Sequence, residues 1–117
     1  MVYGNVCAFC NLQLKLIEAA HIVPVRIDNS TDKTSNGVAL CALHHKSYDY
    51  ALVTFNHRFE IRYDETKMDK LKKIGHDGGM RQFINNLRPA IIVPPEQRDR
   101  PNIDYVKRAN RIRGWKF

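Results

Sequence analysis

Three cysteines and one histidine of this chain have the spacing of a metal-binding site. Cys7 and Cys10 are separated by two residues, and so are Cys41 and His44 later in the chain. A two-residue spacing lets both side chains of a pair point at one ion from a tight turn. Two such pairs supply the four nitrogen and sulfur ligands of a structural zinc site. In the alternative interpretation the cysteines are small buried residues of the core. The pattern favours a structural Zn²⁺ held by Cys7, Cys10, Cys41 and His44.

A second set of polar residues is interleaved with these ligands. His21 lies in an apolar segment, Asn36 in a polar loop, and His45 directly after His44. One imidazole can deprotonate water while a divalent metal ion stabilises the charge on a phosphodiester. Imidazole titrates near neutral pH, and the apolar segment fixes the direction of His21, so His21 is the candidate base. Neighbouring helical side chains point about 100° apart, so His44 can face zinc while His45 binds the catalytic metal.

Three further side chains can support this chemistry. Asn36 can hold its loop and orient His21 through a backbone carbonyl, and it is also a possible metal ligand. Asp49 follows His45 by four residues and therefore shares its helix face, where it can accept a hydrogen bond from the imidazole or bind the metal. Glu18, three residues before His21, either supports the site or forms a solvent-exposed salt bridge.

Hydrophobic spacing predicts the elements that position these residues. Leucines at positions 12, 14 and 16 alternate with polar residues, which predicts a half-buried strand that continues through residues 17–22. Polar residues before Asn36-Gly37 predict a loop that ends in a turn. The remaining expectations are a strand over 38–40, a helix over 42–50, a β-hairpin from 52–55 and 59–63, helices over 67–74 and 80–87, an extended segment over 89–95, and a final helix capped by Asn102.

Composition limits the class of protein and its partners. The 117 residues carry a net charge of +7 and are 44% hydrophobic, which is typical of one small domain with a polyanionic partner. The expected strands and helices make its fold class α+β. We expect a core over residues 1–65 and a helical and extended C-terminal extension over 66–117, packed on the same domain. No apolar run approaches the ~18 residues of a membrane span. We therefore expect a cytoplasmic protein without a membrane partner.

At these positions the sequence resembles the HNH (ββα-metal) endonucleases, in particular a restriction-type branch. The resemblance covers about residues 7–61 and implies a ββα-metal core braced by structural zinc, with an added β-hairpin and C-terminal helices. It also implies that His21 is the general base, that Asn36 positions it, and that His45 ligates Mg²⁺ or Mn²⁺. Many of these nucleases have a metal ligand immediately before the base, where this chain has Ala20. The matching residues are Glu18-Ala-Ala-His21-Ile-x-Pro24, Asn36-Gly37-x-x-Leu40-Cys41, His44-His45 and Tyr48-Asp49.

The function expected from this pattern is metal-dependent cleavage of double-stranded DNA, as the cleavage domain of a restriction or modification-dependent nuclease. Cleavage of both strands needs two active sites, which makes a homodimer a possible assembly. The alternative is a non-catalytic zinc-braced module that binds nucleic acid or a partner protein. Arg113 is expected on the basic face of the last helix, and that face either contacts phosphate or is simply solvated. The other candidates for DNA contact are Lys46, His57, Arg58, Lys107, Arg108 and Arg111.

Overall fold

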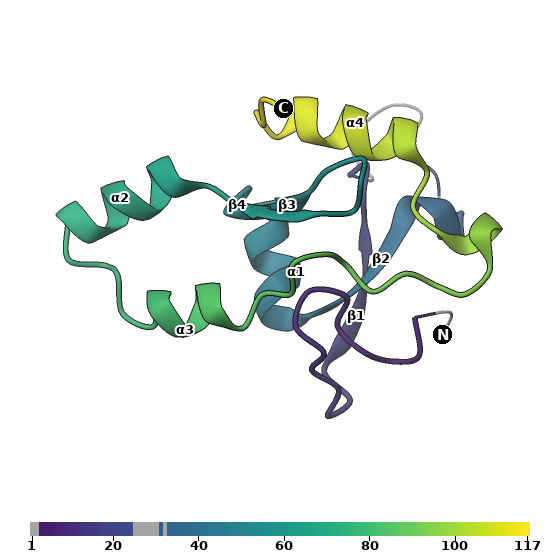
Figure 1. Ribbon diagram of the computed structural model, residues 1–117, viewed down its shortest axis with the longest axis horizontal. Helices are drawn as coiled ribbons and strands as arrows, with labels where there is room; N and C mark the ends of the chain where they lie inside the picture. The colour runs from purple at the N-terminus through teal and green to yellow at the C-terminus, as the bar shows by residue number, and fades with distance from the viewer. Residues whose placement is uncertain (1–2, 25–30, 32) are drawn as a thin grey trace.

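The computed structural model of this protein describes residues 3–24, 31 and 33–117 (Figure 1). Its centre is a two-stranded antiparallel sheet of β1 (Ile17–His21) and β2 (Gly37–Cys41), followed without a break by helix α1 (Ala42–Asp49). The register pairs Ile17 with Cys41 and His21 with Gly37. The expected β1, β2 and α1 segments are therefore confirmed, and the α+β class with them.

The expected strand over residues 12–16 is wrong. β2 turns into α1 after Cys41, which pairs with Ile17, so residues before Ile17 have no strand beside them in this sheet. Leu14 and Lys15 instead have left-handed φ angles of 54° and 57°, and the side chains of Leu14 and Leu16 are 74% and 51% exposed. The alternating leucines therefore lie in an exposed turn rather than in a strand.

A second antiparallel pair completes the core. β3 (Val53–Phe55) and β4 (Ile61–Tyr63) form the expected hairpin. Its turn is held by Asn56, whose side-chain oxygen accepts hydrogen bonds from the backbone N–H groups of Arg58 and Glu60. Phe55 from this hairpin contacts Phe9 and Tyr48, with ring centroids 6.0 Å away in each case. This buried aromatic cluster joins the hairpin to α1 and the N-terminal loop.

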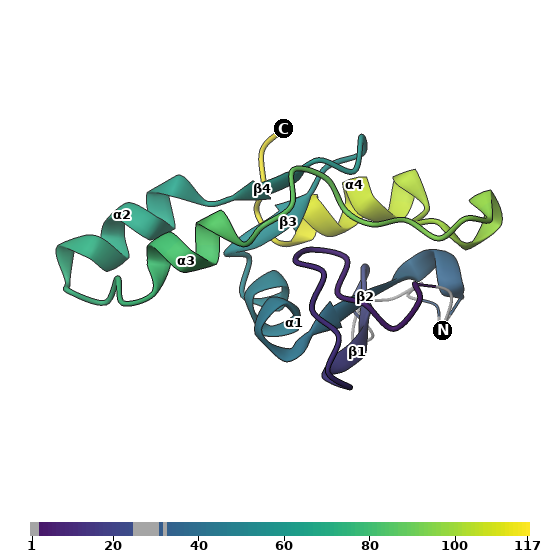
Figure 2. The same cartoon turned by 60° about the horizontal axis from the view of Figure 1, so that its bottom comes forward.

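The C-terminal half runs back along this core. Helices α2 (Glu65–Lys73) and α3 (Met80–Asn85) project from one end of the molecule in both views (Figure 1, Figure 2). The extended segment that follows returns between the hairpin and the N-terminal loop, because Ala90 bridges Glu60 and the N–H of Ile92 donates to Ala8. A 3₁₀ turn, Thr34–Asn36, precedes β2, and another, Gln97–Asp99, precedes α4.

Helix α4 (Ile103–Ile112) covers the hairpin and begins as expected. The side-chain oxygen of Asn102 accepts hydrogen bonds from the N–H groups of Asp104 and Tyr105, which satisfies two donors that the helix itself leaves free. The buried face consists of Val106, Ala109 and Asn110. Within the described part of the chain, no helix is both long and apolar enough to cross a lipid bilayer.

Candidate active site and metal cluster

The four predicted zinc ligands come together in space. The ligand atoms of Cys7, Cys10, Cys41 and His44 all lie within 4.8 Å of one another. His44 presents Nδ1 to the sulfurs, 3.3 Å from Sγ of Cys41 and 3.6 Å from Sγ of Cys7. All three cysteines are free of disulfides. A site of three thiols and one imidazole at this spacing can hold a metal ion, and its donor set suits zinc.

Local backbone contacts explain why the cysteine pair faces β2. The N–H of Ala8 donates to the carbonyl of Ala39 at 2.8 Å, which fastens the N-terminal loop to β2. The N–H of Asn11 donates to the carbonyl of Cys7, and Asn11 itself has a left-handed φ of 70°. The resulting tight turn directs Cys7 and Cys10 toward the point where β2 becomes α1.

The electrostatics of the cluster favour a bound cation. Burial opposes ionisation of Cys7, but hydrogen bonds from His44 and from the backbone of Cys41 and Phe9 outweigh it and lower the Cys7 pKa to about 6. Burial, with the nearby charge of Cys7, raises the pKa of Cys10 to about 12. Burial likewise raises the pKa of Cys41. Burial and the proximity of a thiolate at Cys7 thus oppose ionisation of Cys10 and Cys41, and a divalent cation would supply the positive charge that these thiols need to ionise.

The two candidate catalytic histidines share a pocket of about 450 Å³. His21 enters it from the end of β1, while His45 and Asp49 enter from successive turns of α1. His45 is thus directed away from its neighbour His44, as the helical geometry predicts. The remaining lining residues are Pro24, Tyr50, Ala51, Lys67, Ile112 and Arg113.

Carboxylates flank both ring nitrogens of His45. Nδ1 lies 3.0 Å from Oε1 of Glu18, and Nε2 lies 3.5 Å from Oδ2 of Asp49. A neutral imidazole carries a proton on one nitrogen only. If the closer partner, Glu18, accepts that proton at Nδ1, Nε2 is left with a lone pair beside a carboxylate oxygen, which is a donor pair for a divalent cation. Glu18 is 53% exposed, yet it contacts the site directly rather than forming a salt bridge remote from it.

Asn36 lies just behind His21 and is 1% exposed. Its side-chain oxygen accepts from the N–H of Val23 at 2.8 Å, and its amide nitrogen donates to the carbonyls of Val23 and Thr31 at 3.3 and 2.6 Å. Its own carbonyl accepts from the N–H of Ile22. These contacts fix the chain where it leaves His21. Its side-chain oxygen accepts a hydrogen bond from the backbone, and a role of Asn36 as a metal ligand stays a prediction.

The sequence reasoning missed Arg113, whose side chain is only 6% exposed. Its guanidinium donates to the carbonyl of Ile22 at 2.7 Å, lies 3.5 Å from Oδ1 of Asp49, and stacks 4.2 Å from the ring centre of Tyr48. The expectation of an exposed basic residue is wrong here. Helical spacing could have predicted this burial. Arg113 lies seven residues after Val106 and three after Asn110, so it continues the buried face of α4.

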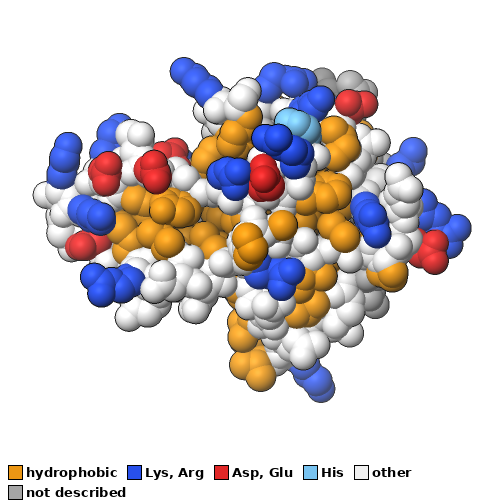
Figure 3. Space-filling model, in the orientation of Figure 1, with side chains coloured by type: hydrophobic (Ala, Val, Ile, Leu, Met, Phe, Trp, Pro, Cys, Tyr) orange, Lys and Arg blue, Asp and Glu red, His pale blue; other side chains and the backbone are white. Residues whose placement is uncertain are grey.

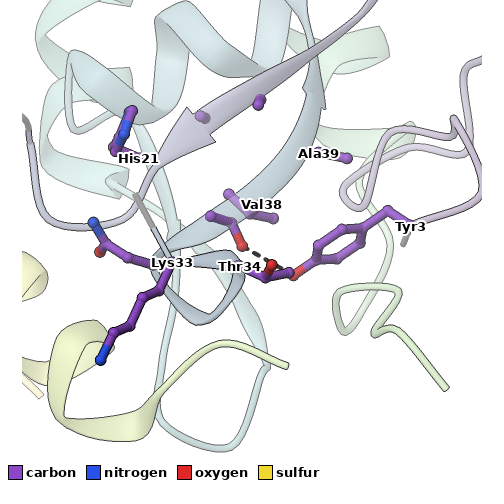
Figure 4. A pocket seen from close by; sticks show the side chains of 10 residues that line it. Tyr3, His21, Lys33, Thr34, Val38 and Ala39 are labelled. Carbon is purple, nitrogen blue, oxygen red and sulfur yellow. Dashed lines mark hydrogen bonds between the residues drawn. The ribbon is translucent and has the colours of Figure 1, made fainter. Parts of the chain in front are cut away.

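A second, more apolar pocket of about 410 Å³ opens beside β1 and β2 and also includes His21 (Figure 4). The figure shows Tyr3 and Lys33 among its lining side chains, with the Tyr3 hydroxyl donating to the carbonyl of Gly37 at 3.2 Å. Burial raises the pKa of Tyr3 well above its usual range. Because neither His45 nor Asp49 lines this pocket, the candidate active site is the pocket that joins all three residues.

The candidate DNA-contacting residues are placed unequally. Lys46 is exposed and lines a shallow pocket beside Glu18 and His45. His57 and Arg58 lie exposed at the hairpin turn, where Arg58 pairs with Glu60 at 3.4 Å. On α4, Lys107 and Arg111 are exposed and Arg108 is half-buried. Figure 3 shows Lys and Arg side chains scattered over the visible face rather than gathered in one patch.

Comparisons with known proteins agree with this geometry. Residues 7–56 match the sequence profile of the HNH endonuclease family. Among solved structures, the fold is similar to one described as "Modification dependent TagI restriction endonuclease", with a TM-score of 0.64 and 14% sequence identity. The match covers 94% of this chain but only 34% of that chain, so this protein corresponds to about a third of it. No curated protein matches the sequence significantly.

The family match bears on the class of protein. The resemblance to the HNH endonucleases is confirmed over residues 7–56, the segment that contains His21, Asn36, His45 and the metal cluster. The TagI likeness shows that the fold extends over nearly the whole chain. The family match over this segment supports a nuclease.

Proposed function

We propose that this chain is a metal-dependent DNA endonuclease in which His21 is the general base and His45 binds a catalytic divalent cation. The observation that carries the proposal is the shared pocket of His21, His45 and Asp49, built where β1 and α1 meet. A base and a metal-binding histidine on opposite elements leave room for a phosphodiester between them.

The reaction follows from these placements. His21 accepts a proton from a water molecule, the water oxygen forms a bond to phosphorus, and the bond from phosphorus to the leaving oxygen breaks. A bound Mg²⁺ or Mn²⁺ supplies stabilisation of the negative charge on the phosphate and the leaving oxygen. Asn36 holds the backbone of Val23 and so limits the movement of His21. Base catalysis of this kind typically contributes about 10²- to 10⁴-fold in rate.

We infer that His45 and Asp49 hold the catalytic cation and that Glu18 orients His45. Glu18 lies at hydrogen-bonding distance from Nδ1, and Asp49 lies beside Nε2. This arrangement compensates for Ala20, which is buried and has no donor atom. The acidic side chains of the site are therefore Glu18, which lies two positions before Ala20, and Asp49 on α1.

We further propose that Cys7, Cys10, Cys41 and His44 bind a structural zinc ion. Four nitrogen and sulfur donors complete a tetrahedral shell and leave no position for substrate, which separates this site from the catalytic one. The cluster joins the N-terminal loop to the β2–α1 junction. The metal cluster would therefore stabilise the position of α1, the helix that contains His45 and Asp49.

As to biological role, we propose the cleavage domain of a restriction or modification-dependent system acting on double-stranded DNA. The support is the family match and the TagI likeness, in which this chain corresponds to 34% of the other chain. Sequence or modification specificity is then the task of residues outside this core. Because each chain offers one such pocket among its described residues, we propose a homodimer for cleavage of both strands.

The test is nicking of supercoiled plasmid DNA in Mg²⁺ or Mn²⁺ by the wild type, His21→Ala and the matched control His76→Ala. His76 is exposed beyond α2 and lines neither pocket that contains His21, so its variant should cleave like the wild type. We expect His21→Ala to lose about 10²-fold or more. Equal nicking by wild type and His21→Ala would refute the base assignment.

The alternative is a non-catalytic zinc-braced module that binds DNA or a partner protein. It needs the cysteine cluster but neither His21 nor His45. A zinc-loaded wild-type protein that binds DNA and cleaves none, in either metal, would support this alternative against the proposal.

A further inference from the structure

Arg113 connects the C-terminal helix to both halves of the candidate active site. Nη1 donates to the carbonyl of Ile22, the residue after His21, at 2.7 Å. Nη2 lies 3.5 Å from Oδ1 of Asp49, one turn beyond His45 on α1. One guanidinium thus contacts the residue that follows β1 and the face of α1 that carries His45 and Asp49. Arg113 is 91 positions away from Ile22 in the sequence.

We propose that Arg113 is a positioning residue that sets the separation between His21 and the His45–Asp49 pair. This inference rests on the proposed nuclease function. It assigns part of the active site to the C-terminal region, which lies outside the matched segment of residues 7–56.

The position of Arg113 is itself fixed by the helix that carries it. Asn110 is buried on α4, where its side-chain oxygen accepts from the hydroxyl of Thr54 at 2.6 Å and its amide nitrogen donates to the carbonyl of Phe55 at 3.0 Å. These bonds tie α4 to β3. Arg113, three residues later, is the C-cap residue of α4, and its N–H donates to the carbonyl of Ala109 at 3.0 Å. It is therefore held at the end of a rigid element, and a guanidinium held in this way can fix the groups that it contacts.

The chain that leaves His21 is held from two sides. Asn36 accepts from the N–H groups of both Ile22 and Val23, through its main-chain and side-chain oxygens respectively. Arg113 donates to the carbonyl of Ile22. Donor and acceptor groups of the same short segment are thus engaged by two elements distant in sequence, which restricts the direction of the preceding imidazole.

Arginine suits this place better than lysine. A planar guanidinium can donate to Ile22 and Asp49 at once while its face stacks on Tyr48, whose ring centre is 4.2 Å away. A lysine ammonium is a point charge and cannot reproduce the stacked, forked geometry. Methionine keeps the apolar contact with Tyr48 but has no donor.

The low exposure of Arg113 distinguishes positioning from DNA contact. Arg113 lines the candidate active-site pocket, but its side chain is only 6% exposed, with one guanidinium nitrogen donating to the carbonyl of Ile22 and the other 3.5 Å from Asp49. Its loss should therefore lower kcat rather than raise KM for DNA.

The experiment compares Arg113→Met and Arg113→Lys in the zinc-loaded protein, with Arg81→Met as the matched control. Arg81 is exposed on α3 and is not among the residues that line the active-site pocket, so the control removes the same charge away from the site. We measure kcat and KM for plasmid DNA, thermal unfolding, zinc content, and hydrogen exchange of the amides of residues 21–23. His21→Ala is assayed in parallel.

We expect Arg113→Met to lower kcat about 10- to 100-fold with KM changed less than about threefold, since a displacement near 1 Å is enough for such a loss. Amide exchange at residues 21–23 should rise, zinc content should stay at the wild-type value, and Arg113→Lys should recover part of kcat. If Arg113→Met does not fold, the Lys variant carries the test: an intermediate kcat with unchanged KM supports the proposal.

Several results would overturn it. A wild-type kcat in folded Arg113→Met, even with a lower melting temperature, would leave Arg113 a purely structural role. A raised KM with unchanged kcat would make it a DNA contact. Failure of this inference is separable from failure of the proposed function: an inactive His21→Ala beside a fully active Arg113→Met rejects only the inference, whereas an active His21→Ala rejects the function itself.

Discussion

Replacing Asn36 tests whether this buried amide braces His21 or contacts the reacting centre. The side chain is 1% exposed and hydrogen-bonds both backbone groups of Val23 and the carbonyl of Thr31. In Asn36→Ala these groups lose that partner. The cost is about 1–3 kcal/mol for each buried group, and the two groups of Val23 dominate because Thr31 is only partly buried. We expect a loss of about 2–6 kcal/mol in the free energy of unfolding.

Such a loss is a large part of the about 5–15 kcal/mol that holds a domain of this kind folded. Urea denaturation at saturating zinc should show it as a midpoint shift of about 1 M or more, given a slope of about 1–3 kcal/mol per M. Nicking activity should fall as well, because the chain that leaves His21 is no longer held.

Asn36→Asp sharpens the test. The carboxylate keeps the acceptor for the N–H of Val23 but turns an oxygen toward the carbonyls of Val23 and Thr31, where the amide nitrogen was a donor. A buried charge facing two acceptors is unfavourable, so at pH 7.5 this variant should be no more stable than Asn36→Ala. If Asn36→Asp instead proves as stable and as active as the wild type, the side-chain oxygen serves the metal and the bracing argument is refuted.

Four further predictions concern other parts of the molecule. Chelation of zinc, or Cys10→Ser, should abolish the cooperative unfolding transition seen by circular dichroism, because binding of a structural zinc is coupled to folding; a folded, metal-free Cys10→Ser protein would disprove the zinc assignment. Zinc affinity measured by calorimetry should rise with pH, since burial raises the pKa of Cys10 to about 12 and these thiols must release protons to bind. Glu18→Gln should change the free energy of unfolding by less than about 1 kcal/mol, because the Glu18–His45 pair is partly exposed. The same variant should raise the Mg²⁺ concentration for half-maximal cleavage about tenfold or more, and an unchanged metal requirement would exclude Glu18 from orienting His45. Asn102→Ala should cost about 1 kcal/mol through loss of the α4 cap, measured as a lower thermal midpoint; an unchanged midpoint would contradict the capping role.

Much of the site could be predicted from the sequence because its spacing is local. The two-residue gaps in Cys7–Cys10 and Cys41–His44 depend only on the geometry of a turn and of one helical turn. The divergence of His44 and His45 follows from the helical repeat, and the pairing of His45 with Asp49 from the same repeat. The cap at Asn102 is equally local. Each of these features was expected from the sequence, and the structure contains each of them.

The tertiary structure decided what depends on contacts between distant segments. The leucine alternation over residues 12–16 satisfies a strand pattern, but a strand needs a partner, and β2 ends opposite Ile17. Glu18 reaches His45 only because β1 pairs with β2 and so lies beside α1. Arg113 meets Ile22 and Asp49 only because Asn110 docks α4 on β3. The hydrophobic periodicity of a segment predicts which of its faces is buried. Which other segment packs against that face depends on the tertiary structure.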